Sequence, residues 1–175
     1  MVNVNFMNPF VEAAVEVLKA EVQLVPQRGS LSLTKSALTT NDITVLISLV
    51  GQVQGVVMYG MSIDTGLELV SRMMGQVFKE FDNLAQSGVA EMGNVITGRA
   101  TVKLYEGGFS AMISPPTLIQ GRDVTISTLD FARIIVPLVT EAGEIVIHLA
   151  LRESPTGQQD NNFVDLTIPP SSTKS

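Results

Sequence analysis

The sequence predicts an α+β domain in which helices pack on an antiparallel sheet. Three observations favour this class: two long segments with helical periodicity, a pair of β-branched runs separated by glycines, and further β-rich runs in the last third of the chain. At 175 residues, 45% of them apolar, the chain is long enough for one domain whose core needs neither a disulfide nor a metal.

The first helix is predicted to follow Asn8. Asn8 is a suitable N-terminal cap, and Pro9 suits the first helical position because its missing N–H is not needed there. The apolar residues at helical spacing are Phe10, Ala14, Val17, Leu18 and Val22. Residues 26–30 end this helix, and Leu31 and Leu33 then alternate with polar residues in a weak strand pattern.

A β-hairpin and a shorter helix are predicted next. Residues 43–50 are rich in β-branched side chains and stop at Gly51, and residues 54–61 resume the pattern. Two such runs around a short glycine-bounded link are typical of a hairpin. Residues 64–74 have helical periodicity, and Gly75 is placed to end that helix.

The longest predicted helix spans residues 82–104 and ends before Gly107 and Gly108. The elements predicted beyond it are strands over residues 111–113, 124–138 and 144–151, with a stiff turn at 114–117 and a link at 142–143. From residue 153 onward Ser, Thr, Pro, Gln and Asn dominate. We therefore predict one domain over residues 1–152 and a disordered tail over residues 153–175.

Composition excludes several classes of function. The formal net charge is −6, Lys and Arg form no cluster, and tryptophan is absent, which argues against nucleic acid and anionic membranes as partners. Cysteine is absent and there is one histidine, which excludes thiolate metal sites and cysteine nucleophiles. No secretory signal is visible, and the most apolar stretch, residues 45–59, is interrupted by Gly and Gln, so we expect a cytoplasmic protein with no membrane span.

The helix predicted over residues 82–104 contains several residues of low helix propensity. Three glycines in it each cost about 1 kcal/mol relative to alanine inside a helix. At about 100° per residue, one stripe of this helix is polar or bare and the opposite stripe is small and apolar. The first stripe contains Ser87, Glu91, Asn94 and Gly98, and the second contains Ala85, Val89, Gly93, Ile96 and Ala100.

A carboxylate and a carboxamide one helical turn apart suit the hydrolysis of an aspartyl phosphate. Such a phosphate is already activated, so hydrolysis requires a water held in line with the scissile bond rather than a strong base. The carboxamide of Asn94 can accept a hydrogen bond from this water and donate one to the phosphate, while Glu91 pairs with a cation beside the phosphate. Exposed glutamate and asparagine also occur at this spacing on ordinary helices, so the spacing alone leaves both interpretations open.

Other residues with chemical potential have simpler interpretations. His148 lies in an alternating strand pattern, with no second histidine and no cysteine in the chain, so we interpret it as an ordinary sheet residue and expect no metal site. Gly107 and Gly108 lack the lysine of a phosphate-binding loop and are interpreted as a helix stop. Met73, Met74 and the other methionines are interpreted as core residues.

Several blocks of sequence occur together in order. They are residues 42–51 with 55–61, the run Glu91-Met-Gly-Asn94-Val-Ile-Thr-Gly98-Arg-Ala, residues 113–117 and residues 136–143. In these blocks the chain resembles the CheX family, part of the wider CheC/FliY/CheX group of chemotaxis phosphatases. The resemblance implies a CheC/CheX-like fold, with two pseudo-related halves whose helices pack on an antiparallel sheet.

The resemblance also implies an active site. The family pattern is Asp or Ser, three residues, Glu, two residues, Asn, and Ser87, Glu91 and Asn94 match it position by position. It implies that Asn94 orients the attacking water, that Glu91 pairs with the active-site lysine of a phosphorylated response regulator such as CheY, and that Ser87 supports the interface. We assign Gly98, on the same stripe, to partner binding. The chain needs no cofactor of its own, since Mg²⁺ is expected on the partner.

Two further expectations come from the resemblance. Some relatives carry the motif in both halves, but here Asn8 and Glu12 are followed by Val15, which cannot position a water, so one active site per chain is expected. CheX relatives also form homodimers by strand pairing, which implies a homodimer that uses one of the C-terminal strands. The alternative to a phosphatase is a non-catalytic module that docks receiver domains or flagellar switch components, because fold alone does not determine function.

Overall fold

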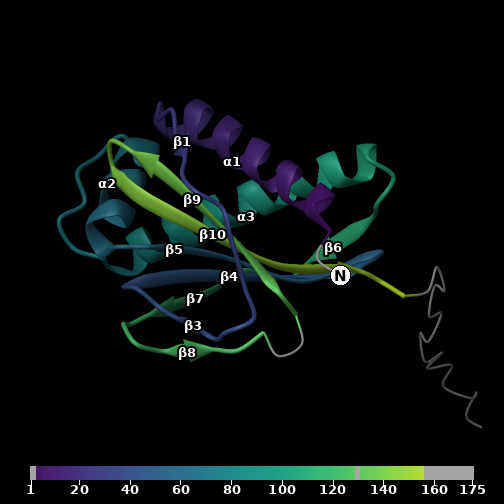
Figure 1. Cartoon of the computed structure of the whole chain (residues 1–175). Coiled ribbons are helices and arrows are strands. Elements are labelled where there is room, and N and C mark those ends of the chain that lie inside the picture. The colour runs from purple at the N-terminus through teal and green to yellow at the C-terminus, as the bar shows by residue number, and fades with distance from the viewer. Residues whose placement is uncertain (1–2, 129–130, 156–175) are drawn as a thin grey trace, which may run out of the picture.

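The structure is a computed structural model of the chain, and it describes residues 3–128 and 131–155. An eight-stranded antiparallel sheet carries helices on one face, and a two-stranded sheet lies below the other face in Figure 1. The helices are η1 (Val4–Phe6, a 3₁₀ turn), α1 (Met7–Val22), α2 (Ile63–Met74) and α3 (Asn83–Glu106). The strands are β1 (Gln27–Arg28), β2 (Ser32–Thr34), β3 (Leu38–Thr39), β4 (Ile43–Gly51), β5 (Val53–Met61), β6 (Ala111–Ile113), β7 (Thr117–Gln120), β8 (Thr125–Ile126), β9 (Arg133–Thr140) and β10 (Gly143–Glu153).

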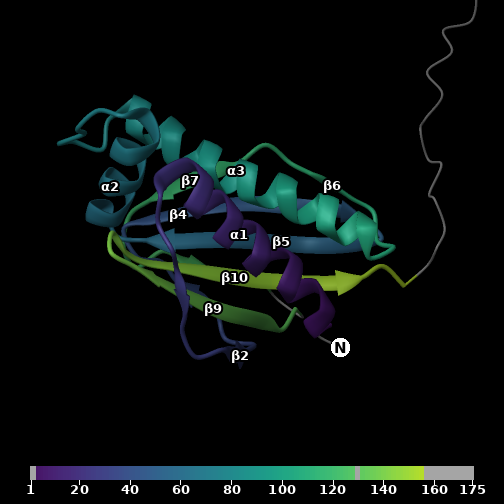
Figure 2. The same cartoon turned by 90° about the horizontal axis from the view of Figure 1, so that it is seen from above.

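The sheet is built from two hairpins that meet at its centre. Its order is β1-β9-β10-β5-β4-β6, with β2 also paired to β9 and β7 to β4. Strand β5 runs antiparallel to β10 from Val53 opposite Glu153 to Gly60 opposite Val146. Each half thus supplies one long helix and one hairpin, α1 with β4–β5 and α3 with β9–β10, and the two helices lie side by side on the sheet (Figure 2). The predicted α+β class, with two related halves, is confirmed.

The start of α1 differs from the prediction. The helix begins at Met7 after the 3₁₀ turn, so Asn8 lies inside the helix and does not cap it, and that part of the prediction was wrong. Asn3 caps the preceding turn instead, where its side chain accepts a hydrogen bond from the Asn5 N–H at 3.0 Å. Pro9 still falls in the first turn of the helix, where its missing N–H leaves no bond unmade.

The central hairpin and the two later helices agree with the predictions. Strands β4 and β5 are joined at Gly51, and α2 begins at a cap formed by Ser62, whose hydroxyl accepts from the Thr65 N–H at 3.1 Å. Gly75 ends α2 in the left-handed conformation, with φ of 67°. Asp82 caps α3 by accepting from the Ala85 N–H at 2.9 Å.

The C-terminal strands differ in two places. Residues 124–138 do not form one strand: β8 leaves the main sheet to pair with β3, and β9 begins only at Arg133. Strand β7 was not predicted, and it pairs with the outer edge of β4 directly after the turn at residues 114–117. Strand β10 continues to Glu153, while most of the predicted tail, residues 156–175, lies outside the described residues.

The core lies between the helices and one face of the sheet. Its largest fully buried side chains include Phe6, Phe10, Leu18, Leu24, Ile43, Ile47, Tyr59, Leu69, Leu104 and Leu138. The buried polar side chains on the other face of the sheet include Arg133 at 2% exposure and His148 at 6%. His148 lies opposite Met58 on one side and Ile135 on the other. Burial, with a smaller contribution from the nearby Arg133 charge, lowers the pKa of His148 to about 4.

His148 makes the stability of the fold depend on pH. The unfolded chain binds a proton at His148 below its ordinary pKa of 6.5, whereas the folded protein resists it down to about 4. The stability contributed by neutral His148 is therefore complete above pH 6.5 and is lost as the pH falls towards 4. Between pH 7.5 and pH 5, the free energy of unfolding of the wild type should fall by about 2 kcal/mol more than that of His148→Gln. Urea unfolding of both proteins measures this, and equal decreases would contradict it.

Candidate functional site

The small apolar stripe of α3 is buried on the sheet, as the sequence predicts. All five of its members, Ala85, Val89, Gly93, Ile96 and Ala100, are buried. A Cβ atom added at Gly93 would lie 2.9 Å from Cγ1 of Val45 and 3.3 Å from Cδ2 of Tyr59. Glycine at this position therefore allows the helix backbone to lie directly on β4 and β5.

Gly88 has the same function against α2. A Cβ atom there would lie 2.9 Å from Cγ1 of Val70 and 2.9 Å from Cε of Met74. Two of the three glycines in α3 are thus explained by close packing, and the packing offsets their low helix propensity.

A buried hydrogen-bond chain connects α3 to the sheet beneath the polar stripe. The Thr97 hydroxyl lies 2.7 Å from the carbonyl oxygen of Gly93 and 2.8 Å from the Tyr59 hydroxyl. The carbonyl can only accept, so Thr97 donates to Gly93 and Tyr59 donates to Thr97. Burial raises the pKa of Tyr59 and keeps its donor proton in place. This chain fixes the rotation of α3 on the sheet.

That rotation turns the predicted stripe outward. Ser87 and Glu91 are exposed, and Asn94 and Gly98 are half-buried. Ser87 donates its hydroxyl hydrogen to the Asn83 carbonyl at 2.9 Å, within the same helix. Within residues 3–128 and 131–155, the side chains of Glu91 and Asn94 make no hydrogen bond or ion pair. Both groups therefore remain available to a ligand from outside.

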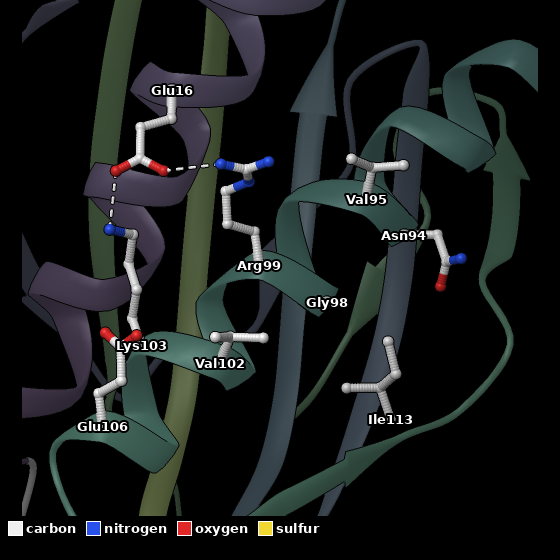
Figure 3. Close-up of a pocket in the computed structure, with 9 residues that line it drawn as sticks. All are labelled: Glu16, Asn94, Val95, Gly98, Arg99, Val102, Lys103, Glu106 and Ile113. Carbon is white, nitrogen blue, oxygen red and sulfur yellow. Dashed lines mark hydrogen bonds and ion pairs between the residues drawn. The ribbon is translucent and has the colours of Figure 1, made fainter.

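Asn94 stands at one end of a groove of about 600 Å³ along α3. The residues that line it are Glu16, Asn94, Val95, Gly98, Arg99, Val102, Lys103, Glu106 and Ile113. In Figure 3, Asn94 and Ile113 lie on one side of the bare helix backbone at Gly98, and Glu16 and Arg99 lie on the other side. The groove is thus apolar along the side that continues from Asn94.

The charged side of the groove is closed by ion pairs between α1 and α3. Glu16 lies 2.7 Å from Nζ of Lys103 and 3.1 Å from Nη1 of Arg99, and Glu12 lies 3.5 Å from Lys103. The hydrogen bond from Lys103, followed by that from Arg99, lowers the pKa of Glu16, and the bond to Glu16 raises the pKa of Lys103. The two cations nearest the groove therefore already have partners.

Sequence reasoning found the polar stripe but missed the groove. Glu16 comes from α1 and Ile113 from β6, and nothing in their local sequence marks them as neighbours of Asn94. Among the described residues there is no cluster of three His, Cys, Asp or Glu side chains able to hold a metal. No helix in the described ranges is long and apolar enough to cross a membrane.

The fold places the chain in a known structural class. It matches a CheC-like superfamily protein from Shewanella sp. PV-4, with 28% identity and a TM-score of 0.79, over 86% of this chain and 99% of that one. It also matches the CheX-CheY-BeF3-Mg²⁺ complex from Borrelia burgdorferi, with 28% identity and a TM-score of 0.71, over 86% of this chain and all of that one (100%). The chain therefore has the CheC-like fold, with helices on an antiparallel sheet.

Sequence comparison identifies the family. Residues 43–139 match the model of the chemotaxis phosphatase CheX family. The CheY-P phosphatase CheX of Thermotoga maritima is 29% identical over 123 residues, which are 70% of this chain and 79% of that protein. The chain belongs to the CheX family of chemotaxis phosphatases, as the sequence resemblance predicted.

Thr97→Val tests the chain of hydrogen bonds beneath the site. Valine has nearly the same shape but leaves the buried Tyr59 hydroxyl without an acceptor, so the free energy of unfolding should fall by about 1–3 kcal/mol. Tyr59→Phe should cost less, about 1 kcal/mol, because Thr97 keeps its bond to Gly93. In urea unfolding the double variant should lose less than the sum of the two single changes. Strict additivity would contradict a shared hydrogen-bond chain.

Proposed function

We propose that this protein hydrolyses the aspartyl phosphate of a phosphorylated response-regulator receiver domain of the CheY type, with Asn94 positioning the water and Glu91 pairing with the receiver's lysine. The observation that carries the proposal is the free Glu91 and Asn94 pair, one turn apart on a helix that is held rigidly against the sheet. A site of this kind needs rigid support because a small displacement of a positioning group has a large effect on rate.

The carboxamide of Asn94 supplies the geometry of the attack. Its oxygen accepts a hydrogen bond from the water, and its nitrogen donates to a phosphoryl oxygen, so one planar group aligns nucleophile and phosphorus. The acyl phosphate is a good leaving group, and the water needs no strong base. Half-burial of Asn94 limits the number of directions from which a competing water can reach it.

Glu91 supplies the negative charge that pairs with the receiver's lysine. One turn before Asn94 and fully outward, its carboxylate reaches a cation that lies beside the phosphate on the partner. Pairing with the receiver's lysine orients the two proteins relative to each other. Ser87 and Gly98, at the two ends of the stripe, belong to the surface that contacts the receiver. Mg²⁺ belongs to the receiver in this proposal, and this chain holds no cofactor of its own.

The relatives support the same assignment. The Thermotoga maritima relative is a CheY-P phosphatase, and the Borrelia burgdorferi structure contains CheX together with CheY, BeF3 and Mg²⁺. We extend the CheY-like partner to this chain because Glu91 and Asn94 are present and unpaired on the outer face of α3. The reaction would then take place in the cytoplasm, where phosphorylated receiver domains are found.

One active site per chain is consistent with the structure of α1. Val15 occupies the position in α1 that would require an asparagine. Glu12, which would correspond to the catalytic carboxylate, is paired with Lys103 of α3 at 3.5 Å. The α1 face is therefore used for packing against α3, and the chemistry is assigned to α3 alone.

We also propose a homodimer formed by strand pairing. Strand β10 lies between β5 and β9 and has no free edge over the described residues, so the strand that pairs between protomers must be nearer the edge of the sheet. Among the described residues, the outer side of β9 is paired with the short strands β1 and β2, so pairing with a partner strand would displace or extend these two strands. Light scattering should give a mass of twice the 18.8 kDa of one chain. A mass of one chain at micromolar concentration would contradict the dimer.

Asn94→Ala tests the proposed reaction most directly. A receiver domain from the same genome is phosphorylated with a small-molecule phosphodonor and Mg²⁺, and the loss of acyl phosphate is followed with and without this protein. Asn94→Ala should reduce the acceleration by about 100-fold or more, because the water is no longer positioned. Binding to the receiver should change little, since alanine removes no charge.

Glu91→Gln and a distant control complete the experiment. Glu91→Gln keeps the size of the side chain but removes its charge, so it should weaken receiver binding and lower kcat/KM by about 10-fold or more. Glu144→Gln makes the same change at an exposed position on β10 and should leave the rate at the wild-type value. If Asn94→Ala were as active as the wild type, the proposed role of Asn94 would be wrong.

A further inference from the structure

The three glycines of α3 differ in what a side chain would meet at each position. An added Cβ atom would lie 2.9 Å from the nearest side chains at Gly88 and at Gly93, but at Gly98 nothing beyond its chain neighbours and the backbone of its own helix lies within 4 Å of an added Cβ. Gly98 also has an ordinary helical backbone rather than a positive φ. Glycine is the least favourable residue after proline inside a helix, so the fold itself gives no reason for glycine at position 98.

The position of Gly98 gives a reason outside the fold. It follows Asn94 by four residues, which places it one turn further along the same face of α3. It forms the bare part of the groove that starts at Asn94, with Val102 beyond it and Ile113 of β6 beside it. Val102 is 57% exposed, a large unpartnered apolar surface next to the bare backbone (Figure 3). The space left by the missing side chain is therefore continuous with the proposed site.

We propose that Gly98 determines partner recognition: its missing side chain lets an apolar side chain of the phosphorylated receiver rest on the α3 backbone between Val102 and Ile113. This inference rests on the proposed function. When the phosphoryl group lies within hydrogen-bonding distance of Asn94, one helical turn of about 5.4 Å separates it from the surface at Gly98. The receiver atoms over Gly98 are then those next to the phosphorylated aspartate.

The charged side chains of the groove, Glu16, Arg99, Lys103 and Glu106, lie on the side of α3 away from Asn94 and Ile113, which leaves an apolar contact beside Gly98 (Figure 3). Arg99 and Lys103 on the far side are paired with Glu16 at 3.1 Å and 2.7 Å, so neither is free to recognise an anionic group. The side continuous with Asn94 offers methyl groups and bare backbone, which bind by shape and by removal of apolar surface from water. A branched side chain at position 98 would fill this space and hold the receiver away from Asn94.

The experiment compares Gly98→Ala and Gly98→Leu with the wild type and with Gly93→Ala. Thermal unfolding should show that Gly98→Ala raises Tm by about 3 °C, because alanine favours the helix and meets nothing. Gly93→Ala, the matched change in the same helix, should lower Tm because its Cβ would lie 2.9 Å from Val45. Binding is measured with the receiver held in its phosphorylated-like form by beryllofluoride and Mg²⁺. Gly98→Leu should weaken that binding by about 10-fold or more and lower kcat/KM in proportion, with Gly98→Ala intermediate.

The outcomes separate this inference from the proposed function. A stabilised Gly98→Ala together with a Gly98→Leu that keeps the wild-type Tm but binds weakly supports the recognition role, because a loss of folding then cannot explain the weaker binding. Wild-type affinity in Gly98→Leu, or a lowered Tm in Gly98→Ala, would overturn the inference while leaving an active wild type as evidence for the phosphatase. A wild type that accelerates phosphate loss from no receiver would overturn the proposed function, and this inference with it.

Discussion

The close approach of α3 to the β4–β5 hairpin at Gly93 is the constraint on which the rest of the structure depends. Without a Cβ atom at this residue, the helix backbone reaches Val45 and Tyr59 directly. The Thr97 hydroxyl is bonded to both the Gly93 carbonyl and the Tyr59 hydroxyl, so only one rotation of the helix gives both buried hydroxyls a partner. In that rotation, with 3.6 residues per turn, the opposite stripe of α3 necessarily faces away from the sheet.

A rigid helix explains why so few groups are needed at the site. In the proposed reaction the scissile bond of the acyl phosphate is already weak, so the contribution required from this chain is the position of one carboxamide and one carboxylate. The asparagine side chain has two rotatable bonds and stands on a long helix that is anchored by buried packing over much of its length. Such a helix holds the carboxamide in a well-defined position. The α1 helix adds to this support, because its carboxylates pair with cations of α3 next to the groove.

Local sequence determined the parts of the fold that depend on neighbours in the chain. The hairpin of β4 and β5, the stop of α2 at Gly75 and the two stripes of α3 all follow from periodicity and glycine placement, and all were predicted. The predictions were wrong where a tertiary contact determines the bounds of an element. Asn8 has the sequence pattern of a cap, but a 3₁₀ turn precedes the helix and the helix already begins at Met7. Residues 124–138 have the pattern of one strand, but they divide where β8 pairs with β3 instead of with the main sheet.

The candidate site divides in the same way. Glu91 and Asn94 share a face because they are three residues apart in a helix, and this spacing can be read directly from the sequence. The groove beside them, in contrast, exists because β6 and α1 approach α3 from elsewhere in the chain. Thr97 illustrates the difference most clearly. Its position on the inner face is predictable, but its bond to Tyr59 joins residues 38 positions apart and depends on the final packing.

The distribution of charge fits a protein in which the partner, rather than this chain, supplies the cations that neutralise the phosphate. The chain has a net charge of −6, so its overall field does not attract an anionic substrate. A free cation beside Asn94 would attract inorganic phosphate, the product, as readily as the phosphorylated receiver. Pairing of Arg99 and Lys103 with Glu16, together with the contact of Lys103 to Glu12, weakens that attraction, because two carboxylates face the two cations. Under the proposed function, affinity then comes from short-range contacts with the receiver itself, which are lost when the two surfaces separate.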